Sequence, residues 1–332
     1  MPHADDLPRW GIVSTIKAPV GAILAFAAHH LDQGAHRLFL YLDDDNQAAF
    51  RILKAHPKIR PVLTDDAYWR ALGMKRRAKH QSRQFENARH AYGRAGDLDW
   101  LAHIDVDEFL LPARPLGAQL ADLPPGCLCG RIRPVEALAP AEPGQPLFAK
   151  AFSLDRATRN RQTEALYPDY GAHLNGGFLS HVAGKMIYRT GIPDLKVNIH
   201  NVTVGEVQNP GQRELTETTL LHCHAKSWQD FIAAFHYRLD KGSYRSELKP
   251  NRPADEGGLT LHELFGMLHA DEGEAGLRRF YDQVCSATPA HLAALEAQGL
   301  LRRPSLDLAG AIARHFPDAR PPAESAGSGR SH

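Results

Sequence analysis

Three carboxylates follow an apolar run in the stretch Trp100-Leu101-Ala102-His103-Ile104-Asp105-Val106-Asp107-Glu108-Phe109-Leu110. The apolar run predicts a buried strand that ends in an acidic tip. Side chains alternate along a strand, so Asp105 and Asp107 are expected on one face, about 7 Å apart, with Glu108 on the other. Two carboxylates at that spacing repel each other unless a cation lies between them, and a divalent cation with oxygen ligands suits that position. The alternative is a solvated acidic turn.

The composition is that of an ordinary globular protein. The chain has 332 residues, of which 43% are hydrophobic and 23% charged, and its formal net charge is +1. This charge gives no general attraction to nucleic acid or to an anionic membrane. No apolar run has the length of a membrane span and the first residues lack the build of a secretory signal, so the expected location is the cytoplasm. The four cysteines do not have zinc-site spacing.

Strand-like and helix-like segments alternate through the first 63 residues. Apolar runs at 11–16, 36–42 and 59–63 predict strands, and the segments 20–33 and 48–55 predict helices between them. This order is typical of an open α/β sheet, which binds ligands at the carboxyl ends of its strands. The second strand ends in Asp43-Asp44-Asp45, so two acidic tips are expected at the same edge. No glycine-rich fingerprint follows the first strand, which disfavours a dinucleotide-binding fold.

The middle of the chain supplies candidate contacts for a phosphate. A long basic helix is predicted over 74–94, directly before the acidic strand, and its cations could reach a phosphate at that edge. The proline-rich segment 110–147 predicts turns and one strand at 127–132. Gly176-Gly177 predicts a close backbone approach, and further strands are predicted at 184–189, 196–202 and 220–226. The candidate phosphate contacts are Lys75, Arg76, Lys185 and Arg189.

The last third of the chain predicts helices. Ser227 is a good N-cap for an amphipathic helix that ends at Lys241. Thr260 and Glu263 form a predicted capping box for a helix through Met267, and another helix is predicted over 289–298. We therefore expect an α/β domain at 1–226, a helical extension at 227–316 and a disordered tail at 317–332.

The order of these features resembles bacterial glycosyltransferases of the family-2-like group, close to glycosyltransferase family 92. The resemblance covers about residues 9–245, and its most specific part is the Asp-x-Asp-Glu-Phe sequence after the tryptophan-led strand. Supporting parts are a helix with His29-His30, a polar helix with Gln81 and Asn87, and strands or turns with Gly184-Lys185, His200-Asn201-Val202 and His222 before Lys226-Ser227. The resemblance implies a GT-A-like (Rossmann-like) mixed sheet flanked by helices, with a C-terminal helical extension. It also implies that residues 1–226 are the nucleotide-sugar-binding and catalytic domain.

The resemblance also implies a reaction. A sugar would move with inversion from a nucleotide-diphospho-sugar, UDP-linked by preference, to a hydroxyl of a glycan, lipid-linked or other acceptor, as in cell-surface polysaccharide synthesis. Asp105 and Asp107 would hold Mn²⁺ or Mg²⁺, with His222 as a third ligand and His200 as its rival. Asp105 would also contact the donor, and Asp43 the base or ribose. Lys17 is the donor contact in the first loop, where relatives often have an asparagine–glutamate pair.

Inversion requires a carboxylate that takes the proton from the acceptor hydroxyl. Glu164 and Asp169, just before the Gly176-Gly177 turn, are the preferred candidates, and Asp155, Asp194 and Glu206 are the others. Two different functions compete with this hypothesis. A nucleotidyltransferase would use the same metal chemistry but prefers a glycine-rich loop after the first strand, and a non-catalytic scaffold would bind the nucleotide-sugar without turnover.

Overall fold

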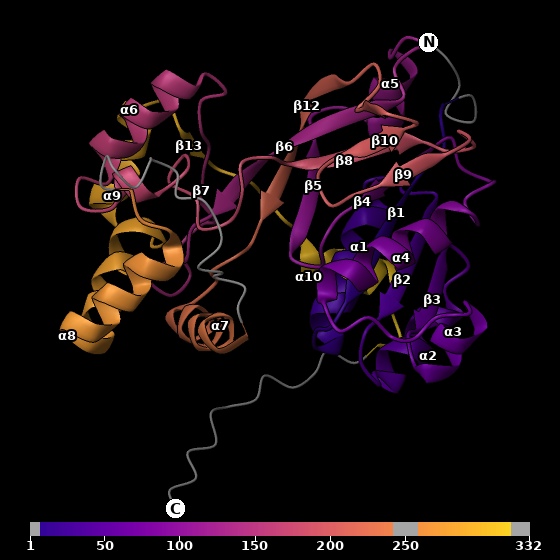
Figure 1. The fold of residues 1–332 in the computed structure, drawn as a ribbon, viewed down its shortest axis with the longest axis horizontal. Helices are drawn as coiled ribbons and strands as arrows, with labels where there is room; N and C mark the ends of the chain where they lie inside the picture. The colour runs from indigo at the N-terminus through magenta and orange to yellow at the C-terminus, as the bar shows by residue number, and fades with distance from the viewer. Residues whose placement is uncertain (1–6, 242–257, 320–332) are drawn as a thin grey trace, which may run out of the picture. The chain divides into compact units, whose positions relative to one another are not determined.

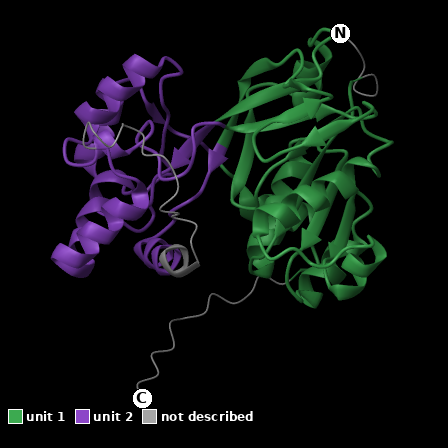
Figure 2. Ribbon diagram, in the orientation of Figure 1, with its two compact units in different colours: residues 1–133, 184–220, 306–332 green, residues 134–183, 221–305 purple. Residues whose placement is uncertain are grey.

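The computed structural model of the chain describes residues 7–241 and 258–319, which form two compact units (Figures 1 and 2). Unit 1 contains residues 7–133, 184–220 and 306–319 of the described chain, and unit 2 contains residues 134–183, 221–241 and 258–305. The domain limits expected at 226 and 316 stay a prediction. Residues 320–332 of the predicted disordered tail lie outside the described residues.

Unit 1 is built on a mixed sheet with the strand order β6-β8-β4-β1-β2-β3. Four of its strands run parallel, while β8 and the first part of β6 extend the sheet in the antiparallel sense. The structure confirms the predicted mixed sheet, and it confirms the first three strands to within one residue at each end. The strands are β1 (Trp10–Ile16), β2 (Arg37–Leu42), β3 (Ile59–Leu63), β4 (Trp100–His103), β6 (Cys129–Ala137) and β8 (Lys185–Arg189).

Helices cover both faces of this sheet (Figure 1). Helices α1 (Val20–Asp32) and α10 (Leu308–His315) share a hydrophobic core with Ile12 and the residues that alternate with it. Helix α4 (His80–Tyr92) shares a second core with Val13 on the opposite face. Because successive strand residues point to opposite faces, burial on both sides produces the continuous apolar runs that the sequence shows.

The remaining elements of unit 1 surround this sheet. The strand predicted over 196–202 is wrong, because the backbone turns between β9 and β10, where the Asn198 N–H donates to the Asn201 carbonyl at 2.8 Å. His200 therefore lies in a turn. The other elements are α2 (Gln47–Ala55), α3 (Asp66–Ala71), β5 (Glu108–Pro112), α5 (Leu116–Ala121), the small sheet of β9 (Leu195–Val197), β10 (Val202–Val204) and β11 (Val207–Gln208), and most of β12 (Arg213–His222), which pairs with β5.

The prediction of one long basic helix over 74–94 is also wrong for its first residues. Helix α3 is closed by Gly73 at φ +70°, and α4 begins only at His80. The segment between them is not helical. Arg76 and Arg83 both turn towards Asp43, and Arg83 also donates to the carbonyls of residues 77 and 78. The basic segment thus folds over the tip of β2 and does not form the first turns of a helix.

Unit 2 is mainly helical, as the sequence predicts for the C-terminal region. Its core contains aromatic side chains, among them Phe231, Phe265 and Phe280. The capping box of Thr260 with Glu263 is confirmed, but the helix continues past Met267 to Val284 through a kink at Gly273. Helix α6 was not predicted. The elements are β7 (Ala149–Lys150), α6 (Arg156–Leu166), the 3₁₀ turn η2 (Gly171–His173), α7 (Trp228–Lys241), α8 (Leu261–Val284), α9 (Pro289–Ala297) and β13 (Leu301–Arg302).

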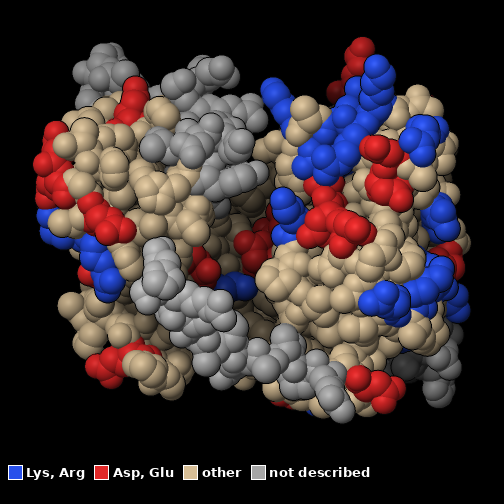
Figure 3. Space-filling view, turned by 90° about the horizontal axis from the view of Figure 1, so that it is seen from below, with Lys and Arg blue, Asp and Glu red and all other residues tan. Residues whose placement is uncertain are grey.

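The charged surface is mixed in sign. On the face drawn in Figure 3, lysine and arginine side chains are interspersed with aspartate and glutamate, in keeping with the net charge of +1. Across the described segments, no helix is both long enough and apolar enough to cross a membrane.

Candidate functional site

Three parallel strands of unit 1 end side by side. The Asp43 N–H at the tip of β2 donates to the Ile16 carbonyl at 2.7 Å, and the Ile104 N–H after β4 donates to the Val13 carbonyl at 3.2 Å. Carboxyl ends of parallel strands meet at one edge of a sheet, where ligands of α/β proteins bind. The two predicted acidic tips therefore share this edge.

Helix α4 presents a polar side to the same edge. Its polar side chains are spaced so that three of them share one face of the helix. Each of the three is bonded to the end of a different strand, so one helix fixes three strand tips. Arg83 Nε donates to Asp43, Gln84 Nε2 to Asp105, and Asn87 Nδ2 to Thr15, at 2.8, 2.6 and 2.9 Å.

Several hydrogen-bond donors surround the Asp43 carboxylate. Its side chain is 1% exposed and forms ion pairs with Arg76 and Arg83, both at 2.8 Å, while Thr64 Oγ1 donates to it at 3.2 Å. Burial alone would raise the pKa of this carboxyl, but bonds from His80 and Arg83 and the charges of the two arginines hold the pKa well below its usual range. Asp43 is therefore an ionised carboxylate held in a fixed orientation.

The acidic stretch itself adopts a turn. Strand β4 ends at His103 and β5 begins at Glu108, so Asp105 and Asp107 lie in the connection and the predicted strand alternation does not apply to them. The Asp105 N–H donates to Glu108 Oε2 at 2.8 Å, and the Glu108 N–H donates to the Asp105 carbonyl at 3.1 Å. Glu108 therefore closes the turn and does not point away from Asp105.

Lys185 joins two of these carboxylates. Its side chain is fully buried, and Nζ lies 2.6 Å from Asp105 Oδ2 and 3.4 Å from Glu108 Oε2. Burial alone would lower the pKa of Lys185, but the charges of Asp105 and Glu108 raise it above its usual value. The lysine predicted as a phosphate contact is thus a buried cation inside the acidic turn. His200 is close by, with Nδ1 bonded to the Gly184 carbonyl at 2.9 Å.

His103 was not identified from the sequence. It is 2% exposed, and neither ring nitrogen has a hydrogen-bond partner among the described residues. Burial, followed by the charge of Lys185, lowers its pKa to about 4. His103 is therefore a neutral side chain beneath the acidic turn at neutral pH.

Three histidines of unit 2 form a cluster. The ring centroids of His222 and His224 lie 5.2 Å apart, and those of His181 and His222 lie 6.2 Å apart. His222 ends β12, and the alternation of His222-x-His224 was the sequence signal for the second histidine. Two neighbouring imidazoles of this kind are suitable ligands for a transition metal.

A buried ion pair supports the same unit. Lys150 Nζ lies 3.2 Å from Glu136 Oε1 and donates to the Gly177 carbonyl at 2.5 Å. Ser180 donates to Glu136 through its N–H and its hydroxyl. Burial would raise the pKa of Glu136, but the charges of Lys150 and His224 and the bonds from Ser180 lower it to about 2. Local patterns do not predict this pair, because the segment around Lys150 has no clear periodicity.

The other predicted site residues lie at the surface. Glu164 is exposed on α6, and Asp169 is exposed and accepts a bond from Gln283 Nε2 at 2.9 Å. Lys17 is exposed in the loop after β1, and Lys75 is exposed before α4. The remaining candidates have structural contacts or exposed positions: Asp155 caps α6, Arg189 lies over the Trp100 ring at 4.5 Å, and Asp194 and Glu206 are exposed.

Comparison with solved structures finds distant similarity to three transferases or synthases. A 4-diphosphocytidyl-2C-methyl-D-erythritol synthase matches with a TM-score of 0.26 and 16% identity, over 42% of this chain and 66% of that protein. The galactosyltransferase LgtC, in complex with donor and acceptor sugar analogues, matches with a TM-score of 0.27 and 14% identity, over 54% and 57%. The apo bifunctional glycosyltransferase WbbM matches with a TM-score of 0.27 and 12% identity, over 57% and 32%.

This chain spans less than two thirds of each of these three proteins. No protein-family model matches the sequence, and no curated protein matches it significantly. The similarity is thus distant and structural.

Proposed function

We propose that this protein is a metal-dependent, inverting glycosyltransferase that moves a sugar from a nucleotide-diphospho-sugar, UDP-linked by preference, to a hydroxyl acceptor. The observation that carries the proposal is the pair of acidic strand tips, Asp43 and Asp105, which α4 holds at one edge of a mixed α/β sheet. The resemblance of the Asp-x-Asp-Glu-Phe stretch to the family-2-like glycosyltransferases supports the same reaction.

The donor would bind through groups of unit 1. A ribose hydroxyl or a base N–H of the nucleotide would donate a hydrogen bond to the Asp43 carboxylate, which the arginines hold ionised and in a fixed orientation. Asp105 would accept from the donor while Gln84 and Lys185 hold its carboxylate in place. Lys17, exposed in the loop after β1, would meet the negative charge of the donor.

Asp105 and Asp107 would hold a divalent cation with His222 as third ligand, and His224, whose ring centroid lies 5.2 Å from that of His222, is a further ligand of suitable chemistry. A donor set that mixes carboxylate and imidazole fits Mn²⁺ better than Mg²⁺, because Mg²⁺ prefers oxygen ligands alone. When bound, such an ion acts as a Lewis acid that stabilises the negative charge on the departing nucleoside diphosphate. His200 remains the alternative histidine ligand.

The proton of the acceptor hydroxyl requires a carboxylate base on the face of the sugar opposite the leaving group. Glu164 and Asp169 are our candidates, because both carboxylates are exposed to solvent. In this mechanism the base takes the hydroxyl proton, the acceptor oxygen bonds to the anomeric carbon, and the bond to the diphosphate breaks.

The central test is hydrolysis of a UDP-sugar without acceptor, in the presence of Mn²⁺. We expect Asp105→Asn and Asp107→Asn each to lower the rate at least about 100-fold, as expected when charge stabilisation at the reacting centre is lost. Asp45→Asn is the matched control, because Asp45 is exposed near the β2 tip and bonds only to Gln47 among the described residues. Equal rates in all four proteins would contradict the proposal.

The same assay separates the two rivals. A nucleotidyltransferase would release pyrophosphate when it is given a nucleoside triphosphate and a sugar phosphate. Such an enzyme prefers a glycine-rich loop after the first strand, and the loop after β1 in this protein, Lys17-Ala18-Pro19, contains no glycine. A scaffold would bind UDP-sugar and show no turnover with any acceptor.

The metal site is tested by the thermal midpoint of unfolding. A ligand that binds the folded state raises this midpoint in a concentration-dependent way. We expect UDP to raise it more with Mn²⁺ than without, and His222→Ala and His224→Ala to abolish the Mn²⁺-dependent part. His269→Ala serves as control, since His269 is exposed on α8. A Mn²⁺ effect that survives both substitutions would exclude these histidines as ligands.

A further inference from the structure

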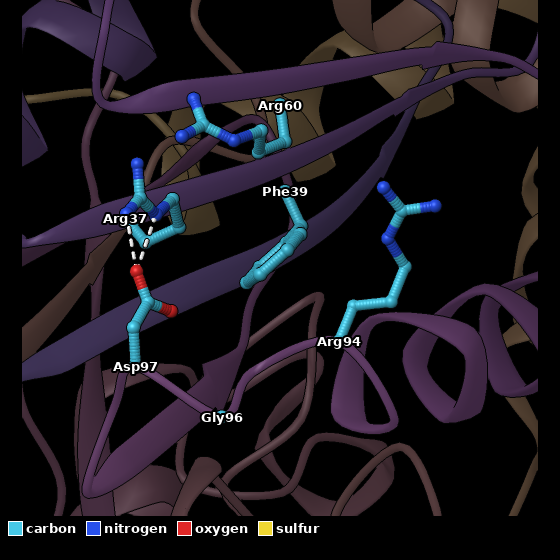
Figure 4. Close-up of a pocket in the computed structure, with 6 residues that line it drawn as sticks. All are labelled: Arg37, Phe39, Arg60, Arg94, Gly96 and Asp97. Atoms are coloured by element: carbon cyan, nitrogen blue, oxygen red, sulfur yellow. Dashed lines mark hydrogen bonds and ion pairs between the residues drawn. The ribbon is translucent and has the colours of Figure 1, made fainter.

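A cationic hollow lies in unit 1, at the start of the strands whose ends form the candidate site. Its volume is about 290 Å³, close to the lower end of the range for small-molecule sites. Figure 4 shows Phe39 between Arg94 on one side and the Arg37–Asp97 pair on the other. The lining residues are Arg37, Phe39, Arg60, Arg94, Gly96 and Asp97.

The sheet register explains why these residues meet. Arg37 and Phe39 alternate along β2 and therefore share a face, and Phe39 is paired with Arg60 on β3. The connection from α4 to β4 then brings Arg94 and Asp97 to that face. The hollow is thus built by regular strands and a short connection.

The three arginines differ in their bonds. Arg37 is paired with Asp97 and also donates to the Pro57 carbonyl at 3.1 Å. Among the described residues, Arg60 donates only through Nη1, to the carbonyls of residues 57 and 59. Within the described segments, Arg94 forms no ion pair and its guanidinium donates no hydrogen bond. Two guanidinium groups therefore keep donors for a ligand.

The charges leave room for one compact anion. Three arginines against one aspartate leave two formal positive charges around a hollow of small volume. The guanidinium fork matches phosphate geometry and binds it through paired hydrogen bonds. An extended polyanion would instead require cations spread along a stripe. The geometry points to a binding site for a dianionic phosphate monoester, in contact with Arg60 and Arg94, that is separate from the donor site.

The separation follows from strand length. Arg37 begins β2 and Asp43 follows its end, so six residues at about 3.3 Å each place them about 20 Å apart. The diphosphate of a donor at the Asp43 edge cannot reach this hollow while its base contacts Asp43. The inference therefore does not depend on the proposed transferase activity.

The experiment is isothermal titration of the full chain with inorganic phosphate, a sugar monophosphate and a nucleoside monophosphate, with acetate as a monoanionic comparison. We expect saturable phosphate binding, weaker acetate binding, and about tenfold weaker phosphate binding in Arg60→Gln and in Arg94→Gln, equivalent to about 1.4 kcal/mol each. The tighter of the two monophosphates identifies the source of the phosphate, and either order supports the site.

Two arginine variants control for charge. Arg89→Gln removes an exposed cation of α4 outside the hollow, and Arg76→Gln removes one at the Asp43 edge. Arg89→Gln should bind phosphate as the natural chain does, and Arg76→Gln tests whether phosphate binds at the Asp43 edge instead. Binding that is lost in Arg76→Gln but kept in Arg60→Gln and Arg94→Gln would overturn the proposal, as would the absence of saturable binding. Unfolding curves of each variant establish that it is folded.

Discussion

Lys185 is a fully buried cation between Asp105 and Glu108. Such an ion pair adds little net stability, because each charge loses its hydration on burial. Removing one partner is different, since the remaining charges stay buried without compensation. The role of Lys185 in this structure is to allow carboxylates to be held at the strand tip.

We therefore expect Lys185→Met to lower the free energy of unfolding by about 3 to 5 kcal/mol. Lys196→Met, at an exposed position on β9, should change it by no more than about 0.5 kcal/mol. Urea denaturation of both variants measures the difference. A Lys185→Met protein as stable as the Lys196→Met protein would show that the acidic turn does not need the lysine.

The residues of the acidic turn show what the sequence could predict. The strand and its acidic end could be predicted from the apolar run before Asp105 and the acidic residues that follow it, because hydrophobic periodicity is a local property. The contact of Lys185 with Asp105 joins positions that are 80 residues apart. Such a contact depends on the pairing of β4 with β8, which local patterns do not reveal.

At the scale of the element, the backbone of the Gly176-Gly177 turn lies close to neighbouring side chains and not to a second backbone segment. Gly177 has φ +75°, and a Cβ atom there would lie 2.4 Å from Tyr167 Cε2. Its carbonyl accepts the bond from Lys150. The turn must therefore be free of a side chain for the buried Lys150–Glu136 pair to form.

Gly177→Ala should destabilise the protein by at least about 2 kcal/mol more than Gly144→Ala. Both glycines have positive φ, at +75° and +77°, so both variants share the backbone strain of about 1 kcal/mol. Only Gly177 adds a steric clash, because a Cβ at Gly144 meets nothing within 4 Å. Thermal and urea unfolding compare the two, and equal losses would show that Tyr167 moves aside freely.

Other elements were mispredicted for reasons that can be stated. The basic segment 74–79 has helix-forming residues, yet the attraction of Arg76 and Arg83 to Asp43 draws it away from a helix. Helix α6 has an N-cap at Asp155, whose side chain accepts a hydrogen bond from the Thr158 N–H at 2.8 Å. The sequence of this helix has no apolar stripe from which it could be predicted. Polar residues fill most of this helix, which is why periodicity failed.

At the scale of the whole molecule, buried neutral histidines are present in both units. Burial lowers the pKa of His29 and His30 in unit 1, and it lowers the pKa of His291 in unit 2 to about 4. His30 accepts the Leu110 N–H and His29 bonds the Leu110 carbonyl. His291 is bonded to the Tyr167 hydroxyl at 2.8 Å. Protonation of His30 Nε2 would remove the acceptor of the Leu110 N–H, and protonation of any of the three rings would bury a positive charge.

Stability should therefore fall in mild acid. The unfolded histidines have a pKa of about 6.5, above the folded values, so below that pH the unfolded chain binds more protons. Each such histidine lowers stability by about 1.4 kcal/mol per pH unit until its folded pKa is reached. Asp43 and Glu136 have lowered pKa values, and their contribution is lost only below about pH 4.

Urea denaturation at pH 7.5 and at pH 5.0 measures this effect. We expect a loss of at least about 2 kcal/mol between the two conditions. Constant stability over this interval would show that the buried histidines are protonated without cost.

The bracing of three strand tips by α4 has a consequence for engineering the protein. Arg83, Gln84 and Asn87 all project from helix α4. A small translation or rotation of this helix would therefore shift Asp43, Asp105 and Thr15 together. Changes of ligand preference made at a single tip would be transmitted to its neighbours. Redesign of this edge should therefore change the helix and these three side chains together. In double-mutant cycles between the three residues, the changes in the free energy of unfolding should not be additive.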